Sequence, residues 1–147
     1  MKSAPFSVMA LLFISCVHLN AVEVPVEYIK NYDGDTLTVN LLELKNLDHY
    51  SFFWKEISIR LAGVDTPEIK GDCDNENKAA QEAKQFVARK LQSARRITLL
   101  NPMRDKYFRI VADVLVDGAS LSQMLLNRDY AVPYDGGTKH KMWCPAN

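Results

Sequence analysis

One arginine and two carboxylates stand close together at residues 60–68, which read Arg-Leu-Ala-Gly-Val-Asp-Thr-Pro-Glu. An arginine can bind a phosphate through two parallel hydrogen bonds, and carboxylate oxygens are the ligands that hard cations such as Ca²⁺ and Mg²⁺ prefer. A cation held near Asp65 would make Glu68 a candidate general base that deprotonates or orients a water molecule. The alternative is an ordinary edge strand that ends in a turn, and these residues alone favour that interpretation.

A further carboxylate belongs to the segment Asp33-Gly34-Asp35, which by itself is typical of a tight hairpin turn. The functional alternative is that Asp35 begins the returning strand with its carboxylate free to bind a cation. Asp35, Asp65, the Thr66 carbonyl and water would then form an oxygen-rich site. Such ligands suit Ca²⁺ or Mg²⁺ rather than zinc, and the three histidines show no metal-ligand spacing.

Basic residues are concentrated at residues 84–109, which hold eight lysines and arginines and one acidic residue. Part of this run is explained as the solvated face of a helix. Residues 104–109, Arg-Asp-Lys-Tyr-Phe-Arg, instead interleave aromatic rings with cations, a mixture that suits a phosphate chain with a base stacked on a ring. Arg109 and Arg60 would have to converge to clamp one phosphate. Tyr134 is a second candidate for an exposed ring, although a ring packed under the fold is equally compatible.

The elements that must position these groups are short strands followed by helices. Alternating apolar residues and turn signals predict five strands, at residues 22–32, 35–41, 57–64, 96–100 and 110–116. On a regular strand Arg60 and Asp65 would point to opposite faces, but a bulge or bend at Gly63 could bring them together.

Two helices and one long loop complete the expected elements. Asp74 or Asn75 can cap a helix that runs to about Leu91, and residues 120–123 have the Ser-x-x-Gln pattern of a capping box that begins a short helix. Residues 42–55 predict a long loop with some buried apolar anchors. Five strands with appended helices favour a small five-stranded OB-type barrel of the all-β or α+β class, although spacing alone also allows a sandwich.

The first residues resemble a processed leader rather than part of the fold. Lys2 is the only charged residue among residues 1–21, and the apolar run that follows it predicts a secretory signal peptide cleaved near Ala21. Lipoprotein processing before Cys16 is the less favoured alternative. Cleavage would leave residues 22–147 as one domain with 17 basic and 18 acidic residues, a net charge of about −1. Net charge therefore gives no nucleic-acid signal, and any such function depends on local clusters.

Two cysteines remain after residue 21, Cys73 and Cys144. An even pair in an exported chain favours a disulfide over two unrelated thiols. The predicted product is exported, either periplasmic or secreted.

Together these stretches resemble the thermonuclease family, the staphylococcal-nuclease-like secreted nucleases of bacteria. The resemblance covers nearly all of the chain after residue 21. Its motifs occur in the family's order at residues 33–36, 60–68, 105–109 and 131–137. Each motif alone would be weak evidence, whereas all of them in order are strong evidence.

The resemblance implies an OB barrel that binds Ca²⁺ and hydrolyses the P–O5′ bond of DNA or RNA, leaving 3′-phosphate ends. It further implies a role for each matching residue: Asp35, Asp65 and the Thr66 carbonyl as calcium ligands, Glu68 as general base, Arg60 and Arg109 on the scissile phosphate, Lys106 and Tyr107 on a neighbouring phosphate, and Tyr134 stacked near the nucleotide. We expect a monomer that favours single strands and has no membrane span.

Two residues depart from the family pattern. Phe108 and Tyr130 each stand where a glycine is common, and Phe108 could lean over the substrate groove or alter the loop that aims Arg109. Two other function classes are possible, a non-catalytic OB module that binds single-stranded nucleic acid and a calcium-stabilised structural domain. A binding module has no need of the set Asp35, Arg60, Asp65, Glu68 and Arg109. A structural domain explains the carboxylates but not Arg60, Arg109 and the Lys-Tyr loop, so the nuclease is favoured.

Overall fold

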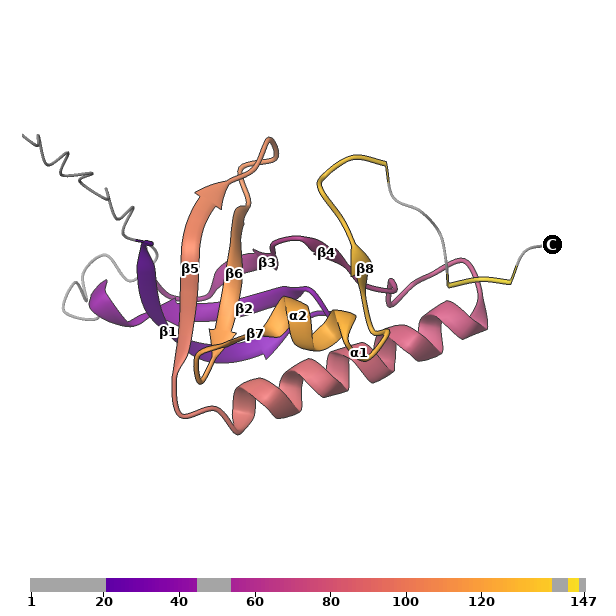
Figure 1. The fold of residues 1–147 in the computed structure, drawn as a ribbon, viewed down its shortest axis with the longest axis horizontal. Helices are drawn as coiled ribbons and strands as arrows, with labels where there is room; N and C mark the ends of the chain where they lie inside the picture. Colours follow the sequence, from indigo (N-terminus) through magenta and orange to yellow (C-terminus); the bar gives the residue numbers. More distant parts are fainter. Residues whose placement is uncertain (1–20, 45–53, 139–142, 146–147) are drawn as a thin grey trace, which may run out of the picture.

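The computed structural model describes residues 21–44, 54–138 and 143–145 (Figure 1). The predicted signal peptide, apart from Ala21, therefore lies outside the described residues, and so does Cys16. Part of the long loop predicted at residues 42–55 also lies outside them. Its beginning is a single turn of 3-10 helix, η1 (Leu42–Leu44). Trp54, near its end, is buried, which agrees with the prediction of some buried apolar anchors in this loop.

Six strands form one sheet in the order β3-β2-β1-β5-β6-β7. The strands of this sheet are β1 (Glu23–Asn31), β2 (Thr36–Leu41), β3 (Ile57–Leu61), β5 (Ile97–Arg104), β6 (Ile110–Val116) and β7 (Ala119–Ser120). β3 also pairs with β6 in parallel, with Ile59 opposite Ile110, and this pairing closes five strands into a barrel. The predicted five-stranded OB-type barrel with appended helices is confirmed.

The barrel interior follows from the alternation of apolar side chains along each strand. On β6, Ala112, Val114 and Val116 are buried, whereas the residues between them are partly exposed. The helices α1 (Asp74–Gln92) and α2 (Leu121–Leu126) add apolar residues to the same core, namely Phe86, Val87, Leu91, Leu121 and Leu125. Figure 1 shows α1 lying along one side of the barrel. Among the described residues, neither helix is long and apolar enough to cross a bilayer.

Strand β5 is longer than predicted. We expected a strand at residues 96–100, and the Pro102 that follows soon after it is a poor strand residue. Instead Asn101 adopts a positive φ of 48°, and the register of β5 on β6 shifts between Leu100 and Met103. This bulge lets pairing continue to Arg104, so the β5–β6 hairpin extends beyond the barrel (Figure 1).

The N-terminus of α1 also differs from the prediction. Neither Asp74 nor Asn75 is the N-cap: Cys73 occupies that position, and its side chain makes no capping hydrogen bond. The Cys73 sulfur is bonded to Cys144 in the predicted disulfide, which spans a sequence separation of 71. Closing a loop of this length stabilises a fold by about 4 kcal/mol in the chain-entropy model. The second helix has the predicted N-cap, since the Ser120 side chain accepts from the Gln123 N–H. The reciprocal half of the predicted capping box is replaced, because the Gln123 side chain donates to Asn127.

Candidate active site

A bend in the chain brings Arg60 and Asp65 to the same place. The strand predicted at residues 57–64 breaks after Leu61, and Gly63 adopts a φ of 76°, a backbone conformation that favours glycine. The chain then enters β4 (Val64–Asp65), which pairs with β8 (Val132–Pro133). As a result Nη2 of Arg60 donates to Oδ1 of Asp65 at 2.9 Å. A bend at Gly63, one of the two ways in which the sequence could bring these residues together, is confirmed.

The same guanidinium pairs with the carboxylate of Asp35. Arg60 lies opposite Thr36 in the β2–β3 ladder, so the carboxylate of Asp35, which immediately precedes β2, is within its reach. Nη1 of Arg60 donates to Oδ1 of Asp35, and the other oxygen, Oδ2, accepts the Thr66 N–H at 2.9 Å. The side chains of Arg60, Asp35 and Asp65 are 12%, 2% and 8% exposed. We call Asp35, Arg60 and Asp65 the buried ion cluster.

The turn before β2 fixes the position of Asp35. Oδ1 of Asp33 accepts the N–H groups of Asp35 and Thr36 at 3.0 and 2.7 Å. The backbone at Gly34 does not have a positive φ, so glycine is required here because a side chain would have no room. A Cβ at this position would lie 2.8 Å from Cγ2 of Thr66 and 3.0 Å from Cβ of Ala83 on α1. The turn, Thr66 and α1 therefore meet where no methyl group fits.

Arg109 is held at the tip of the β5–β6 hairpin by Asp105. Both Nε and Nη2 of Arg109 lie 2.8 Å from Oδ2 of Asp105, and Oδ1 accepts the backbone N–H groups of Tyr107 and Arg109 at 2.8 and 2.9 Å. Desolvation acts to raise the pKa of Asp105, but these hydrogen bonds and the positive charge of Arg109 outweigh it, so the pKa lies below its ordinary value. The carboxylate therefore stays ionised, and Arg109 stays oriented, at neutral and mildly acidic pH.

A cleft of about 470 Å³ joins the hairpin tip to the barrel. Its cationic lining residues are Arg60, Arg104, Lys106 and Arg109, and its aromatic ones are Tyr107 and Tyr134. The Lys106 ammonium lies 5.2 Å and the Arg109 guanidinium 5.4 Å from the centroid of the Tyr107 ring. The two arginines predicted to converge thus line one cleft, together with the predicted substrate residues. Arg60 belongs both to this cleft and to the buried ion cluster.

Glu68 lies in the loop between β4 and α1, three residues after Asp65, and it is exposed to solvent. It is not one of the residues that line the cleft. Its backbone N–H donates to Oε1 of Glu76 at 3.3 Å. Sequence reasoning missed Glu76, which is buried and follows the N-cap by three residues. The signal was available, since a glutamate at this position often reaches back to the chain before the helix.

The buried ion cluster has the donor chemistry that a hard cation requires. Asp35 and Asp65 supply two negative charges against one positive charge of Arg60, so a net negative charge is buried there. A carboxylate oxygen has more than one lone pair, so an oxygen that accepts a hydrogen bond can still coordinate a cation. Oxygen ligands of this kind fit Ca²⁺. The sulfurs of Cys73 and Cys144 lie near the Glu76 carboxylate, but they are bonded to each other and are not metal ligands in this state.

Residues 58–142, more than half of the chain, match the family model described as staphylococcal nuclease homologue. No curated protein matches the chain. The matched segment runs from β3 past β8 and contains Arg60, Asp65 and Arg109. Asp35 precedes it in sequence, but the barrel places its carboxylate on the Arg60 guanidinium. On the match and the barrel together, this chain belongs to the staphylococcal nuclease homologue family.

Proposed function

We propose that this protein is an exported, Ca²⁺-dependent nuclease that hydrolyses the P–O5′ bond of DNA or RNA and leaves 3′-phosphate ends. The family consists generally of phosphodiesterases that act on nucleic acids, which supports the hydrolase class. The observation that carries the proposal is the position of Arg60. Its guanidinium pairs with two buried carboxylates and also lines a cleft rich in cations and aromatic rings. A phosphodiester in the cleft would therefore lie beside a candidate cation site.

The proposed calcium ligands are Asp35, Asp65 and the Thr66 carbonyl. A bound Ca²⁺ would offset negative charge on the phosphate and help to orient the attacking water. Neighbouring residues of the chain hold the Asp35 carboxylate in place. The Thr66 N–H fixes one oxygen of Asp35, and Asp33 fixes the turn that presents it.

Arg60 and Arg109 are the proposed phosphate ligands. Negative charge grows on the phosphoryl oxygens in the transition state, so hydrogen bonds from a guanidinium become stronger there. Asp105 keeps Arg109 oriented before the substrate arrives, which reduces the entropy lost on binding. Lys106 would pair with a neighbouring phosphate, and Tyr107 would contact it from the same tip.

Glu68 is the proposed general base. Its carboxylate would take a proton from water as the water oxygen forms a bond to phosphorus. The P–O5′ bond then breaks, the leaving oxygen takes a proton from solvent to become a 5′-hydroxyl, and the phosphate stays on the 3′ side. An exposed carboxylate can exchange this proton with solvent before the next turnover.

The test is hydrolysis of single-stranded and duplex DNA and of RNA by the chain from residue 22, with Ca²⁺, with Mg²⁺ and with a calcium chelator. We expect cutting with Ca²⁺, a return of activity when Ca²⁺ is added after chelation, and 3′-phosphate ends. Equal cutting in the chelator would reject the calcium dependence. Retained binding without any cutting would instead identify a non-catalytic OB module that binds single strands.

The single-strand preference rests on the exposed rings of the hairpin tip. Tyr107 and Phe108 are 65% and 79% exposed, and Phe108 adopts a φ of 62°, which is unfavourable for a bulky residue. Rings that project beside cations can stack on unpaired bases, whereas the bases of a duplex already stack on each other. We therefore assign the Phe108 ring to base stacking.

Phe108→Gly should raise the KM for single-stranded DNA about 10-fold and leave the KM for duplex DNA nearly unchanged, because one stacked base contributes roughly 1–3 kcal/mol. The same change should stabilise the fold by about 1 kcal/mol, since glycine accepts the positive φ. Phe108→Ala is the matched control, which removes the ring but keeps the strain. A single-strand KM that is unchanged in both variants would contradict the stacking role.

Export is supported by two independent features. The predicted signal peptide at residues 1–21 would direct the chain out of the cytoplasm, and the Cys73–Cys144 disulfide is typical of an oxidising compartment. A periplasmic or released product fits both features. Lipid anchoring through Cys16 is less favoured, because the residues before it match the usual processing signal poorly.

A further inference from the structure

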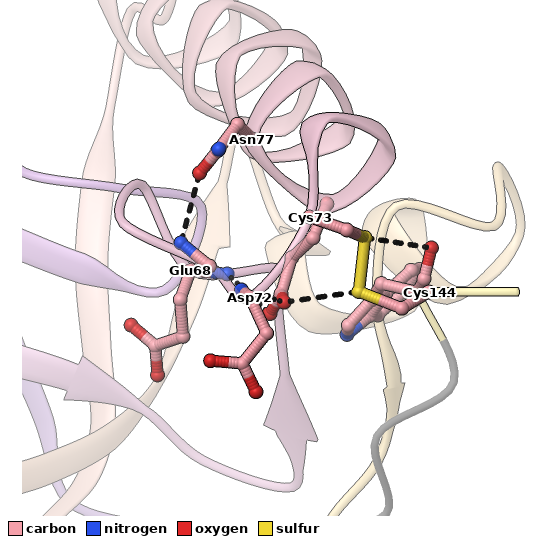
Figure 2. Close-up of a disulfide and its surroundings, with 8 residues drawn as sticks. Glu68, Asp72, Cys73, Asn77 and Cys144 are labelled. Atoms are coloured by element: carbon pink, nitrogen blue, oxygen red, sulfur yellow. Dashed lines mark hydrogen bonds between the residues drawn. A yellow bond between two sulfur atoms is a disulfide. The ribbon is translucent and has the colours of Figure 1, made fainter. Parts of the chain in front are cut away.

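The loop between β4 and α1 is held by side chains in the first turn of the helix (Figure 2). Glu76 is the main contact, with both carboxylate oxygens in use. Oε1 accepts the Glu68 N–H at 3.3 Å, and Oε2 accepts the Asp72 N–H at 3.0 Å. The neighbouring Asn77 accepts the Gly71 N–H at 2.8 Å. Three backbone groups of one short loop are thus bound to two consecutive helix residues.

The Glu76 carboxylate is packed as well as hydrogen-bonded. The residue is 7% exposed, although glutamate is rarely buried without partners. A Cβ at position 71 would lie 2.3 Å from Cδ of Glu76, so a side chain there would displace the Glu76 carboxylate from its present position. From the other side, Sγ of Cys144 lies 3.8 Å from Oε2. Since a disulfide sulfur carries no hydrogen, this is a packing contact, and the disulfide covers the carboxylate.

We propose that Glu76 is a positioning residue for Glu68. It acts through the backbone of residues 68–72, fixing where the Glu68 Cα sits while the Glu68 side chain remains exposed. This inference depends on the proposed function, in which Glu68 is the general base. A base must lie within hydrogen-bond reach of the water that it deprotonates, and a displacement of about 1 Å can lower a rate by a factor on the order of 100. The buried carboxylate of Glu76 therefore serves to fix the position of the Glu68 backbone.

The first experiment combines Glu76→Ala with Glu68→Gln in a double-mutant cycle. Glu76→Ala alone should lower kcat about 10- to 100-fold with KM nearly unchanged, the range typical of residues that orient a catalytic group. In the Glu68→Gln background the same change should have no further effect on kcat, because the base has already been removed. An equal loss of kcat in both backgrounds would mean a general structural role and would overturn the proposal.

The second experiment measures amide hydrogen exchange and needs no catalysis. The Glu68 and Asp72 N–H groups should lose protection in Glu76→Ala and lose less in Glu76→Gln, which keeps one acceptor oxygen. Glu82→Ala, which removes an exposed glutamate of the same helix, is the matched control and should change neither exchange nor kcat. Unchanged protection of the Glu68 N–H in Glu76→Ala would overturn the proposal. A wild-type protein that cleaves no nucleic acid would overturn the proposed function instead, while the exchange result would still report on the loop.

Discussion

Glu68→Gln should lower kcat by about 10²- to 10⁴-fold, the range that general base catalysis contributes. Glutamine has the shape of glutamate, but its amide cannot take up the proton of the attacking water. The fold should not change, because the side chain is exposed and the bond to Glu76 is made by the backbone N–H. The measurement is kcat and KM on single-stranded DNA with Ca²⁺, together with a thermal unfolding curve.

The decisive control is the second exposed carboxylate of the same loop, Asp72. Figure 2 shows the side chains of Glu68 and Asp72 both pointing away from α1. Asp72→Asn removes one negative charge at nearly the same place, so it measures any general electrostatic effect on kcat. We expect Asp72→Asn to retain most of the activity. A fully active Glu68→Gln protein would refute the assignment of the base, and an inactive Asp72→Asn protein beside it would transfer the role to Asp72.

Asp35→Ala should remove both activity and a large part of the stability. The truncation leaves the Arg60 guanidinium and the Thr66 N–H without the carboxylate that they share in a buried place. Arg60 keeps its ion pair with Asp65, but each donor left unsatisfied in a buried place costs about 1–3 kcal/mol. The loss of a calcium ligand should in addition abolish cutting. Asp35→Asn keeps the shape and one acceptor, and should cost about 1.5–3 kcal/mol.

The measurement for Asp35 is urea unfolding with and without Ca²⁺. A ligand that binds the folded state alone stabilises it by about 2.7 kcal/mol at 100 times its Kd, so the wild-type curve should shift when Ca²⁺ is added. Neither Asp35 variant should shift at that concentration. Asp113→Asn is the matched control, since Asp113 is a carboxylate on β6 outside the buried ion cluster. A full calcium shift in Asp35→Asn would show that Asp35 is not a ligand.

The bend at Gly63 could be predicted from the sequence for a physical reason. Arg60 and Asp65 have opposite parity on a strand, and a glycine between them is the residue most able to reverse that parity. The barrel was also predictable, because strand alternation and turn residues are local signals. The β5 extension was not, since Asn101 and Pro102 end most strands, and only the partner strand β6 determines that a bulge continues the ladder here.

The residues that hold the site in position were harder to predict than the residues with functional groups. Asp35, Arg60 and Asp65 could be proposed from their chemistry, but the contact of Glu76 with the loop depends on how α1 meets β4. Cys73 was expected to form the disulfide, but its position as the N-cap was not expected, because its side chain makes no capping hydrogen bond. Contacts between elements depend on tertiary packing, which local pattern does not encode.

Because Gly34 lies so close to Thr66 and Ala83, a small increase in side-chain size can disturb the site even at a residue that does not belong to it. A methyl group at Gly34 would push on Thr66, and a larger side chain at Ala83 would reach the same turn from the middle of α1. Ala83 would then score as functionally sensitive in a mutational scan, although it contacts no substrate in the proposed mechanism. We therefore expect larger side chains to be poorly tolerated at both Gly34 and Ala83, although the two residues belong to different elements. The cause would be steric, and libraries built to alter specificity should leave both residues fixed.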